Sequence, residues 1–310
     1  MKKSPVYDKN KVSIIGCGRV GITTAYALLL EGHVNELVLF NRTLDRVRGE
    51  QLDLEHGMSF LDYTEIVSTN DYADLADSDI IIYTAGCAQK PGETRLDLVE
   101  NNVAILKKSL PQIIRYAPNA IILLVANPVD ILTYKAYLMA NWPKGRIFGS
   151  GTSLDTSRFR FHLSEFLNVN PHSIQAYVLG EHGDSSFPVI SSASVGGQSL
   201  TNFPNFSEEK ALKAYKTTRD AAYKIIEAKG STYYGIATVT AKLVETILRD
   251  EKEILPVSIP LHNYYGHSGI ALSVPCVVGR AGVEEIIEIK LSWEEKQKLE
   301  KSVNTLKSYL

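Results

Sequence analysis

Residues 11–21 read Lys-Val-Ser-Ile-Ile-Gly-Cys-Gly-Arg-Val-Gly, and this stretch decides the fold. Gly16, Gly18 and Gly21 form a G-x-G-x-x-G pattern that directly follows a β-branched run and opens an apolar stretch of helix length. The first glycine permits a tight turn, the second lets the backbone approach a pyrophosphate, and the third lets a helix lie close to the strand. Because the pattern stands between a strand and a helix, it predicts a dinucleotide-binding turn in preference to a chance glycine turn.

Short β-branched runs recur after this turn as far as Gly149, and amphipathic stretches of helix length separate them. The expected strands are residues 11–15, 36–40, 64–67, 79–84, 120–125 and 146–148. The fourth and fifth strands are apolar on both faces, as strands covered by helices on each side must be. This alternation predicts an α/β chain with a Rossmann-type doubly wound parallel sheet in a dinucleotide-binding domain, residues 1–149.

The alternation ends after about Gly149. Helices are expected at residues 154–167, 207–228 and 236–249 and from 292 onward, and strands at 174–178, 189–195, 257–259 and 270–277. This order lacks the βαβ rhythm and predicts an α+β catalytic and substrate domain, residues 150–310.

Composition limits the partners of the chain. Its 310 residues are 45% hydrophobic, and 33 basic residues nearly balance 35 acidic ones. The longest apolar stretch, residues 120–126, is far below the roughly 20 residues that cross a bilayer, and residues 1–12 lack the apolar core of a secretion signal. We therefore expect no nucleic-acid partner, no membrane partner and a cytoplasmic location. Three widely separated cysteines and seven scattered histidines predict neither disulfides nor a metal site.

The end of the second expected strand bears on cofactor choice. An acidic residue is expected there to accept hydrogen bonds from the adenosine ribose, but the chain has Asn41 followed by Arg42. Asn41 can still bond a ribose hydroxyl without repelling a 2′-phosphate, and Arg42 with Arg46 can attract one. We expect NAD as the cofactor with some tolerance of NADP; the alternative is that Arg42 is simply solvated.

Three segments carry groups that make chemical sense together. Asp155 and Arg158 stand three residues apart at the start of an expected helix, so they lie on neighbouring positions of one face. His182 stands between glycines after a strand-like run, and Arg95 ends a polar loop that begins at Gln89 and follows the fourth strand. Taken singly, they would be a surface ion pair, a turn residue and a solvated arginine; their joint occurrence behind a dinucleotide site favours catalysis.

These groups match the needs of a 2-oxo acid. Arg158 can hold a carboxylate with its planar fork, and His182 can donate a proton if a carboxylate such as Asp155 supports its charged form. Arg95 can close over the substrate and polarise its carbonyl. We therefore expect reversible hydride transfer between a nicotinamide and a small 2-hydroxy acid.

The sequence resembles the L-lactate dehydrogenase family, within the wider lactate and malate dehydrogenase group, over nearly its whole length. The resemblance is carried by the glycine turn, residues 89–98, 125–130, 149–152, 154–160, 180–184 and 229–232. It implies that His182 is the proton donor and acceptor, Asp155 its partner, Arg158 the carboxylate clamp and Arg95 the polarising arginine. It also implies a homotetramer that reduces pyruvate in fermentation, as a branch of glycolysis.

The resemblance adds binding residues to those roles. It implies that Asn127 contacts substrate and cofactor, that Ser150 and Val20 contact the cofactor, and that Thr232 lines the substrate pocket. The substrate set is then Gln89, Arg95, Asn127, Arg158 and Thr232. The expected cofactor contacts are Gly16, Gly18, Val20, Gly21, Asn41, Arg46, Tyr72, Gly86, Cys87, Asn127 and Ser150.

Gln89 decides the substrate within this group. Malate-type relatives place an arginine there, and a neutral glutamine leaves a second substrate carboxylate unpaired in a closing pocket. Pyruvate is therefore expected over oxaloacetate. Malate dehydrogenase and a broader 2-hydroxy acid dehydrogenase acting on branched 2-oxo acids remain alternatives, as does a non-catalytic nucleotide-binding sensor, against which the four catalytic candidates argue.

One regulatory property of the family is expected to be weak or absent. Bacterial members are often activated by fructose 1,6-bisphosphate, which an arginine and a histidine bind between subunits. Arg160 matches the arginine, but Gln175 stands where the histidine is expected. A neutral amide removes one cationic partner of the phosphate.

Overall fold

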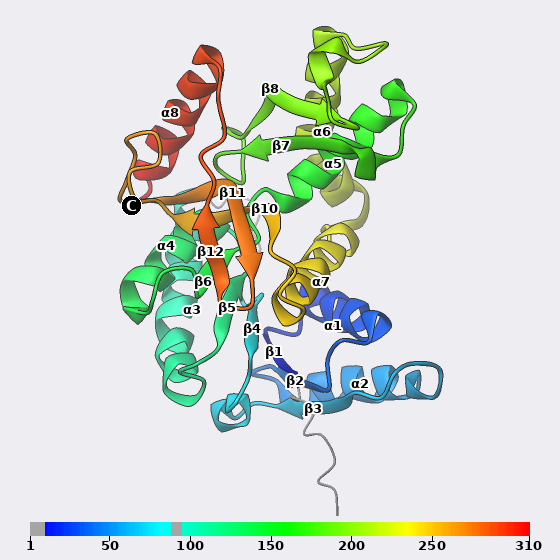
Figure 1. The fold of residues 1–310 in the computed structure, drawn as a ribbon. Helices are drawn as coiled ribbons and strands as arrows, with labels where there is room; N and C mark the ends of the chain where they lie inside the picture. Colours follow the sequence, from blue (N-terminus) through cyan, green and yellow to red (C-terminus); the bar gives the residue numbers. More distant parts are fainter. Residues whose placement is uncertain (1–9, 88–94) are drawn as a thin grey trace, which may run out of the picture.

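A single large sheet forms the centre of the molecule (Figure 1). The computed structural model describes residues 10–87 and 95–310, with the side chains of Arg95 and Leu96 excepted. Within these residues the sheet has nine strands in the order β12-β11-β10-β6-β5-β4-β1-β2-β3. A second sheet, β7-β8-β9, lies above it in Figure 1.

The N-terminal part of the large sheet is parallel, and it confirms the Rossmann-type prediction. Its strands are β1 (Lys11–Ile15), β2 (Glu36–Phe40), β3 (Glu65–Thr69), β4 (Ile80–Tyr83), β5 (Ile121–Leu124) and β6 (Ile147–Gly149). β1 pairs in parallel with β2 on one side and β4 on the other. Every residue of β4 and β5 is buried, as expected for strands covered on both faces.

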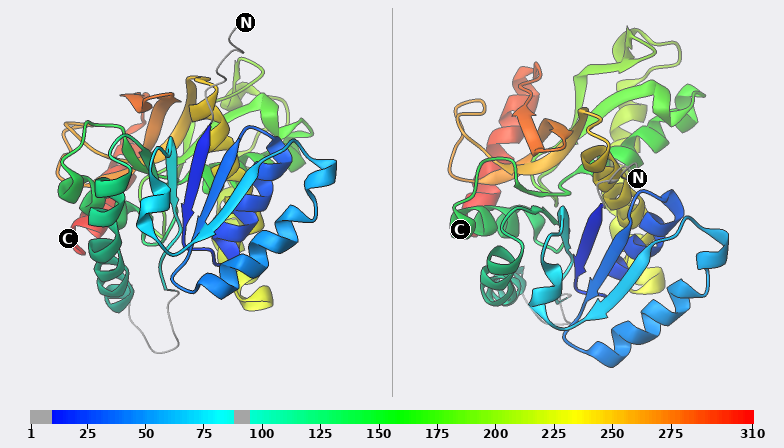
Figure 2. Two further views of the ribbon diagram at one scale, coloured as in Figure 1. Left: turned by 90° about the horizontal axis from the view of Figure 1, so that it is seen from below. Right: turned by 60° about the horizontal axis from the view of Figure 1, so that its bottom comes forward.

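Helices cover both faces of this parallel part. Figures 1 and 2 show α1, α2 and α7 on one face and α3 and α4 on the other. Their bounds are α1 (Arg19–Glu31), α2 (Leu44–Glu55), α3 (Arg95–Tyr116), α4 (Val129–Ala140) and α7 (Tyr234–Leu248). Helix α7 comes from the C-terminal half yet packs directly on α1, so the two halves of the chain share this face.

The large sheet continues into the C-terminal half, which the strand pattern did not indicate. Antiparallel strands β10 (Glu253–Pro260), β11 (Ala271–Gly279) and β12 (Gly282–Ile286) extend it beyond β6. The junction is narrow: Ser258 of β10 pairs with Gly149 of β6. β12 was not expected because its outer residues, Glu284 and Glu285, are exposed and interrupt the apolar pattern.

Five of the remaining elements form a separate layer with its own hydrophobic cluster: β7 (Ile174–Leu179), β8 (Phe187–Val195), β9 (Gln198–Ser199), α5 (Ser153–Leu167) and α6 (Glu208–Lys229). Helix α8 (Trp293–Lys307) instead packs Leu299, Val303 and Leu306 into the core of the large sheet. Short 3-10 turns complete the path at η1 (Met58–Phe60), η2 (Tyr72–Leu75), η3 (Pro171–Ser173) and η4 (Leu200–Asn202). The fully buried Phe159 and Leu163 of α5 pack with Val178 of β7 in this cluster.

The topology brings the predicted site residues to one edge of the sheet. Because β1 to β6 are parallel, the loops that follow them all leave from their carboxyl ends, where open α/β sheets bind ligands. The glycine turn, Asn41, Gly86, Asn127 and Ser150 all stand in these loops. Among the described residues, no helix is long and apolar enough to cross a membrane.

Candidate functional site

The glycine turn after β1 has the geometry that its spacing predicts. Gly16 has a φ of +100°, and a side chain there would place its Cβ 2.7 Å from the backbone of Ala85. A Cβ on Gly21 would collide with the carbonyl oxygen of Gly16, whereas one on Gly18 would meet only open space. Gly16 and Gly21 therefore permit close packing, and Gly18 leaves the start of α1 open. These residues fit a dinucleotide pyrophosphate.

The ribose end of this site lies at the tips of β2 and β3. The backbone N–H of Asn41 donates to the carbonyl oxygen of Thr69 at 3.0 Å, which fixes the loop while the side chain remains partly accessible. Tyr72 is half-buried and its ring centroid lies 4.3 Å from that of Phe40. Burial raises the pKa of Tyr72, and the nearby charge of Arg42 partly opposes this.

Asn41 and Arg42 directly follow β2, so no acidic residue stands at its end. Arg42 and Arg46 are both exposed, and the charge of Arg42 acts on Tyr72. Burial and, after it, the charge of Glu50 raise the pKa of the Cys17 thiol to about 12, and the charge of Arg46 partly opposes this.

The loops after β4 and β5 are joined by a residue that the sequence interpretation missed. Asn102 of α3 is 1% exposed; its amide N–H donates to the carbonyl oxygens of Asn127 at 2.7 Å and Cys87 at 3.1 Å. Its Oδ1 accepts the backbone N–H of Cys87 at 2.8 Å. Asn102 thereby fixes two loops expected to hold the nicotinamide end. The available signal was an asparagine at an inward position of an amphipathic helix.

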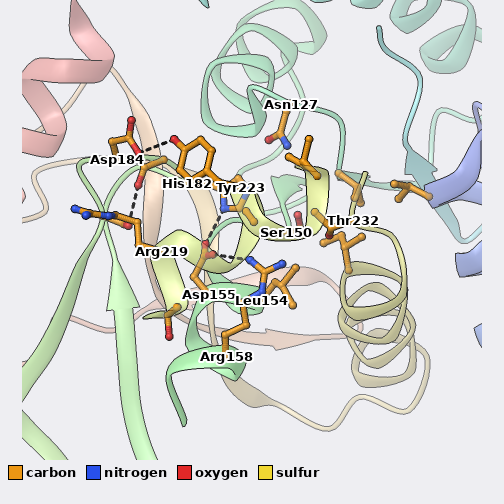
Figure 3. A pocket seen from close by; sticks show the side chains of 18 of the residues that line it. Asn127, Ser150, Leu154, Asp155, Arg158, His182, Asp184, Arg219, Tyr223 and Thr232 are labelled. Atoms are coloured by element: carbon orange, nitrogen blue, oxygen red, sulfur yellow. Dashed lines mark hydrogen bonds and ion pairs between the residues drawn. The ribbon is translucent and has the colours of Figure 1, made fainter. Parts of the chain in front are cut away.

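The catalytic candidates gather in one pocket (Figure 3). The cavity is about 220 Å³ and lies between α5, α6, α7 and the loops after β5, β6 and β7. Seven of the predicted site residues line it: Val20, Asn127, Ser150, Asp155, Arg158, His182 and Thr232. The first and last of them, Val20 and Thr232, are 212 positions apart in the sequence, so the fold alone assembles the group.

Asp155 joins the imidazole and the guanidinium. Its Oδ2 lies 2.7 Å from Nδ1 of His182, and its Oδ1 lies 3.4 Å from Nη1 of Arg158 (Figure 3). Because an ionised carboxylate only accepts, Nδ1 carries a proton and Nε2 is left for a substrate. The helical i, i+3 spacing at the start of α5 places Asp155 beside Arg158 as predicted.

The charges in this group favour a protonated histidine. Burial lowers the pKa of His182, but the charge and hydrogen bond of Asp155 raise it by more, so it lies above its ordinary value. Burial raises the pKa of Asp155, and the interactions with His182 and Arg158 outweigh this and lower it overall. Burial lowers the pKa of Arg158 against the opposing effect of Asp155. A guanidinium nevertheless keeps its charge at neutral pH.

The loop that carries His182 is held at its backbone. Gly180 has a φ of +94° and lies so close to Ser302 of α8 that a Cβ would approach Oγ to 2.6 Å. The N–H of Glu181 donates to Ser302 Oγ at 2.6 Å, and the N–H of His182 donates to Oδ2 of Asp130 at 2.7 Å. Two side chains from distant helices therefore fix two successive peptides of this loop.

Helix α6 forms a wall of the pocket that was not predicted. Tyr215, Arg219 and Tyr223 line it, and their spacing of four residues puts them on one helix face. The Tyr223 hydroxyl donates to Asp184 at 2.9 Å, and the Tyr215 hydroxyl donates to the carbonyl oxygen of Ser186. This periodicity was the signal in the sequence, but it equally fits an ordinary helix–loop contact.

Arg19, a variable position of the glycine pattern, reaches the substrate side of the site. Its Nη1 donates to the carbonyl oxygen of Lys229 at 3.3 Å and to Ser231 Oγ at 3.2 Å. Thr232 follows directly and lines the pocket. The turn between α6 and α7 is thus tied to the start of α1.

Two predicted substrate contacts cannot be placed. Gln89 lies outside the described residues, as does the side chain of Arg95, whose backbone begins α3. Their expected roles stay predictions. Within residues 10–87 and 95–310, no three His, Cys, Asp or Glu side chains gather as a metal site requires.

The candidate allosteric residues lie away from this pocket. Nε of Arg160 donates to the carbonyl oxygen of Ala176 at 3.0 Å, and Nη2 lies 3.5 Å from Oε1 of Gln175. The guanidinium also lies over the ring of Tyr177. The guanidinium of Arg160 therefore already has partners within this chain, and one of them is Gln175, which stands where the histidine was expected.

Comparisons with known proteins cover the chain from end to end. The family model described as lactate/malate dehydrogenase, NAD binding domain, matches residues 10–149. The model described as lactate/malate dehydrogenase, alpha/beta C-terminal domain, matches residues 152–310.

Individual relatives are similar over nearly their full lengths. L-lactate dehydrogenase 1 of Clostridium acetobutylicum is 45% identical over 305 residues, 97% of each chain. L-lactate dehydrogenase of Lacticaseibacillus casei is 43% identical over 307 residues, 98% of this chain and 94% of that protein. The crystal structure of minor L-lactate dehydrogenase from Enterococcus mundtii in its ligands-bound form superposes with a TM-score of 0.94 at 38% identity, covering 97% of both chains.

Proposed function

This chain belongs to the lactate/malate dehydrogenase family, and on that premise we propose that it interconverts pyruvate and L-lactate as an NAD-dependent oxidoreductase. The observation that carries the proposal is the contact of Asp155 with both His182 and Arg158 inside one pocket. Reduction of a 2-oxo acid requires a proton donor and a cation that binds the carboxylate, and Asp155 holds both of these groups beside the dinucleotide site.

Arg158 and His182 bind different groups of the substrate. The fork of Arg158 binds the substrate carboxylate, which fixes the orientation of the molecule in the pocket. The keto oxygen then faces His182, whose free Nε2 donates the proton as that oxygen becomes a hydroxyl. When bound, the reduced nicotinamide supplies the hydride to the carbonyl carbon. In the reverse direction the neutral imidazole takes the hydroxyl proton back.

Asp155 keeps His182 ready for this exchange. Its carboxylate accepts from Nδ1, which fixes the tautomer and the ring orientation, and its negative charge stabilises the imidazolium. Asn127 and Thr232 complete the pocket walls, and Arg95, the first residue of α3, polarises the carbonyl. We assign cofactor contacts to the glycine turn, Val20 and Ser150 and to the others predicted above.

A spectrophotometric assay tests this function directly. NADH oxidation is followed with pyruvate, oxaloacetate and 2-oxoisocaproate, and we expect pyruvate to give the highest kcat/KM because Gln89 supplies no cation for a second carboxylate. Higher values with oxaloacetate or 2-oxoisocaproate would favour a malate or branched 2-hydroxy acid dehydrogenase. No oxidation with any of them would favour a nucleotide-binding sensor. Added fructose 1,6-bisphosphate should barely change the half-saturation by pyruvate.

We expect measurable use of NADPH because Asn41 carries no charge. Replacing it in Asn41→Asp should lower kcat/KM for NADPH by at least roughly tenfold, because the new carboxylate faces the 2′-phosphate, and should leave the value for NADH nearly unchanged. Asn119→Asp is the matched control, since it adds the same charge on the opposite, amino-end side of β5. If the unchanged chain already prefers NADH several-thousand-fold, Asn41 does not relax the selectivity.

We further propose that the chain works in the cytoplasm, as its composition indicates, and as a homotetramer, as the resemblance implies. Support comes from large apolar side chains exposed on and beside α2: Leu52 is 56%, Phe60 89% and Tyr63 80% exposed in the single chain. Contact with another subunit would remove them from water. The three cysteines are free thiols, as suits a reducing compartment.

A further inference from the structure

A buried carboxylate outside the predicted catalytic group lies directly behind the His182 loop. Asp130 is the second residue of α4 and is 2% exposed. Its Oδ2 accepts the backbone N–H of His182 at 2.7 Å, and its Oδ1 accepts the hydroxyl of Ser258 at 2.6 Å. Ser258 is the residue of β10 that pairs with Gly149 of β6. Asp130 therefore stands where the parallel sheet, its antiparallel extension and the catalytic loop meet.

The hydrogen bonds alone do not explain why this side chain is a carboxylate. An asparagine of the same shape would accept from His182 with its oxygen and donate to Ser258 with its amide, since a hydroxyl can also accept. Burying a charge costs far more than burying an amide. What the carboxylate adds is negative charge, which the start of α4 helps to stabilise.

We propose that Asp130 is a positioning residue for the proton transfer: it fixes the peptide of His182, and its charge acts with that of Asp155 to hold the imidazolium. The proposal depends on the proposed function, because it takes His182 as the proton donor. It makes the junction between the two halves of the chain part of the proton-transfer site, since Asp130 belongs to the first half and His182 to the second.

Charged groups from every neighbouring element bear on His182. Helix α5 contributes Asp155 and Arg158, α6 contributes Arg219, and α4 contributes Asp130; the loop itself carries Glu181 and Asp184. The carboxylate of Glu181 accepts the hydroxyl of Ser185, and that of Asp184 accepts the hydroxyl of Tyr223. Asp130 differs from these two because it bonds the His182 peptide itself.

The direction of the electrostatic effect follows from the two titrations. Burial raises the pKa of Asp130 to about 6, with the bonds from Ser258 and His182 opposing it, so the group is ionised at neutral pH. Asp130 is one of the charges that raise the pKa of His182, after Asp155. Removing that charge should therefore lower the pKa of His182, and the imidazolium should lose its proton at lower pH.

The test compares Asp130→Asn, Ser258→Ala and the unchanged protein by the pH dependence of pyruvate reduction. Reduction needs the imidazolium, so its alkaline limb should move to lower pH in Asp130→Asn, and the ratio of turnover at about pH 8.5 to that at about pH 6 should fall several-fold. Ser258→Ala keeps the charge of Asp130 and removes only one of its hydrogen bonds, so its limb should stay near that of the unchanged protein. A loss of turnover with an unmoved limb in Asp130→Asn would overturn the proposal.

A second measurement does not depend on catalysis. The imidazole proton resonance of His182, assigned by its absence in His182→Asn, is titrated by NMR in the three proteins. Its midpoint should be lowest in Asp130→Asn. If that variant does not fold, Asp130→Ser, which also removes the charge but keeps a hydroxyl acceptor, decides: an unshifted midpoint in Asp130→Ser contradicts the proposal. If the midpoints shift as expected but the unchanged protein reduces no 2-oxo acid, the proposed function has failed and the electrostatic coupling stands.

Discussion

His182→Ala is expected to lower the turnover of pyruvate reduction by about 10²–10⁴-fold, the usual loss on removing a general acid. The imidazole is the group whose Nδ1 is held by Asp155 at 2.7 Å and whose Nε2 remains for the substrate. NADH binding should persist, because the glycine turn and the loops after β4 and β5 do not depend on this side chain. Steady-state kinetics and NADH fluorescence titration measure the two effects separately.

The pH dependence of the unchanged enzyme also tests whether His182 is the proton donor. The pKa of His182 is raised by Asp155 against the effect of burial, so reduction, which needs the charged form, should continue above the ordinary titration range of histidine and fall as pH rises further. Lactate oxidation needs the neutral form and should rise over the same interval.

His162→Ala provides the matched control for His182→Ala. Like His182, His162 has a carboxylate partner: its Nδ1 lies 2.8 Å from Oε2 of Glu165. It also lies on α5, the helix that carries Asp155. It is not among the residues that line the pocket. Its removal should leave turnover unchanged. Equal losses in the two variants would mean that the effect comes from destabilising α5 or its surroundings and that His182 is not the proton donor.

The parallel half of the fold could be predicted because its signals are local. A glycine turn between strand and helix, and strands such as β4 and β5 that are apolar on both faces, need no knowledge of distant contacts. The continuation of the sheet through Ser258 and Gly149 is different. It depends on two strands, far apart in the chain, meeting at their ends, and no periodicity within either strand encodes that pairing.

The same distinction separates the predicted site residues from the missed ones. His182, Asp155 and Arg158 could be named because a reaction needs their functional groups and their spacing was suggestive. Asn102 and Asp130 act on backbone groups of other segments, and such a role is visible only when the loops they hold have been placed. A buried polar residue at a helix start or on an inward helix face is the one trace that they leave in the sequence.

Arg158→Lys should reduce kcat/KM for pyruvate by about 10–100-fold, the equivalent of losing one charge-assisted hydrogen bond of about 1.5–3 kcal/mol. Lysine keeps the positive charge but offers a point charge instead of a planar fork. In the unchanged protein, Nη1 of Arg158 lies 3.4 Å from Oδ1 of Asp155. A lysine side chain is shorter and would weaken this contact, so Asp155 would hold His182 less firmly. We expect KM to rise more than kcat falls, because the fork binds the carboxylate before the transition state as well as in it.

The methyl ester of pyruvate makes this prediction specific to the fork. The ester has no ionised carboxylate, so in the unchanged enzyme it should already be a poor substrate, and Arg158→Lys should change its kcat/KM far less than that of pyruvate. Comparing acid and ester in both proteins forms a cycle that isolates the carboxylate contact from any general disturbance of the pocket. Equal losses for acid and ester would show that the variant acts through Asp155 and His182 instead. The carboxylate clamp would then have to be another cation, and Arg219 on α6, which also lines the pocket, would be the candidate to test.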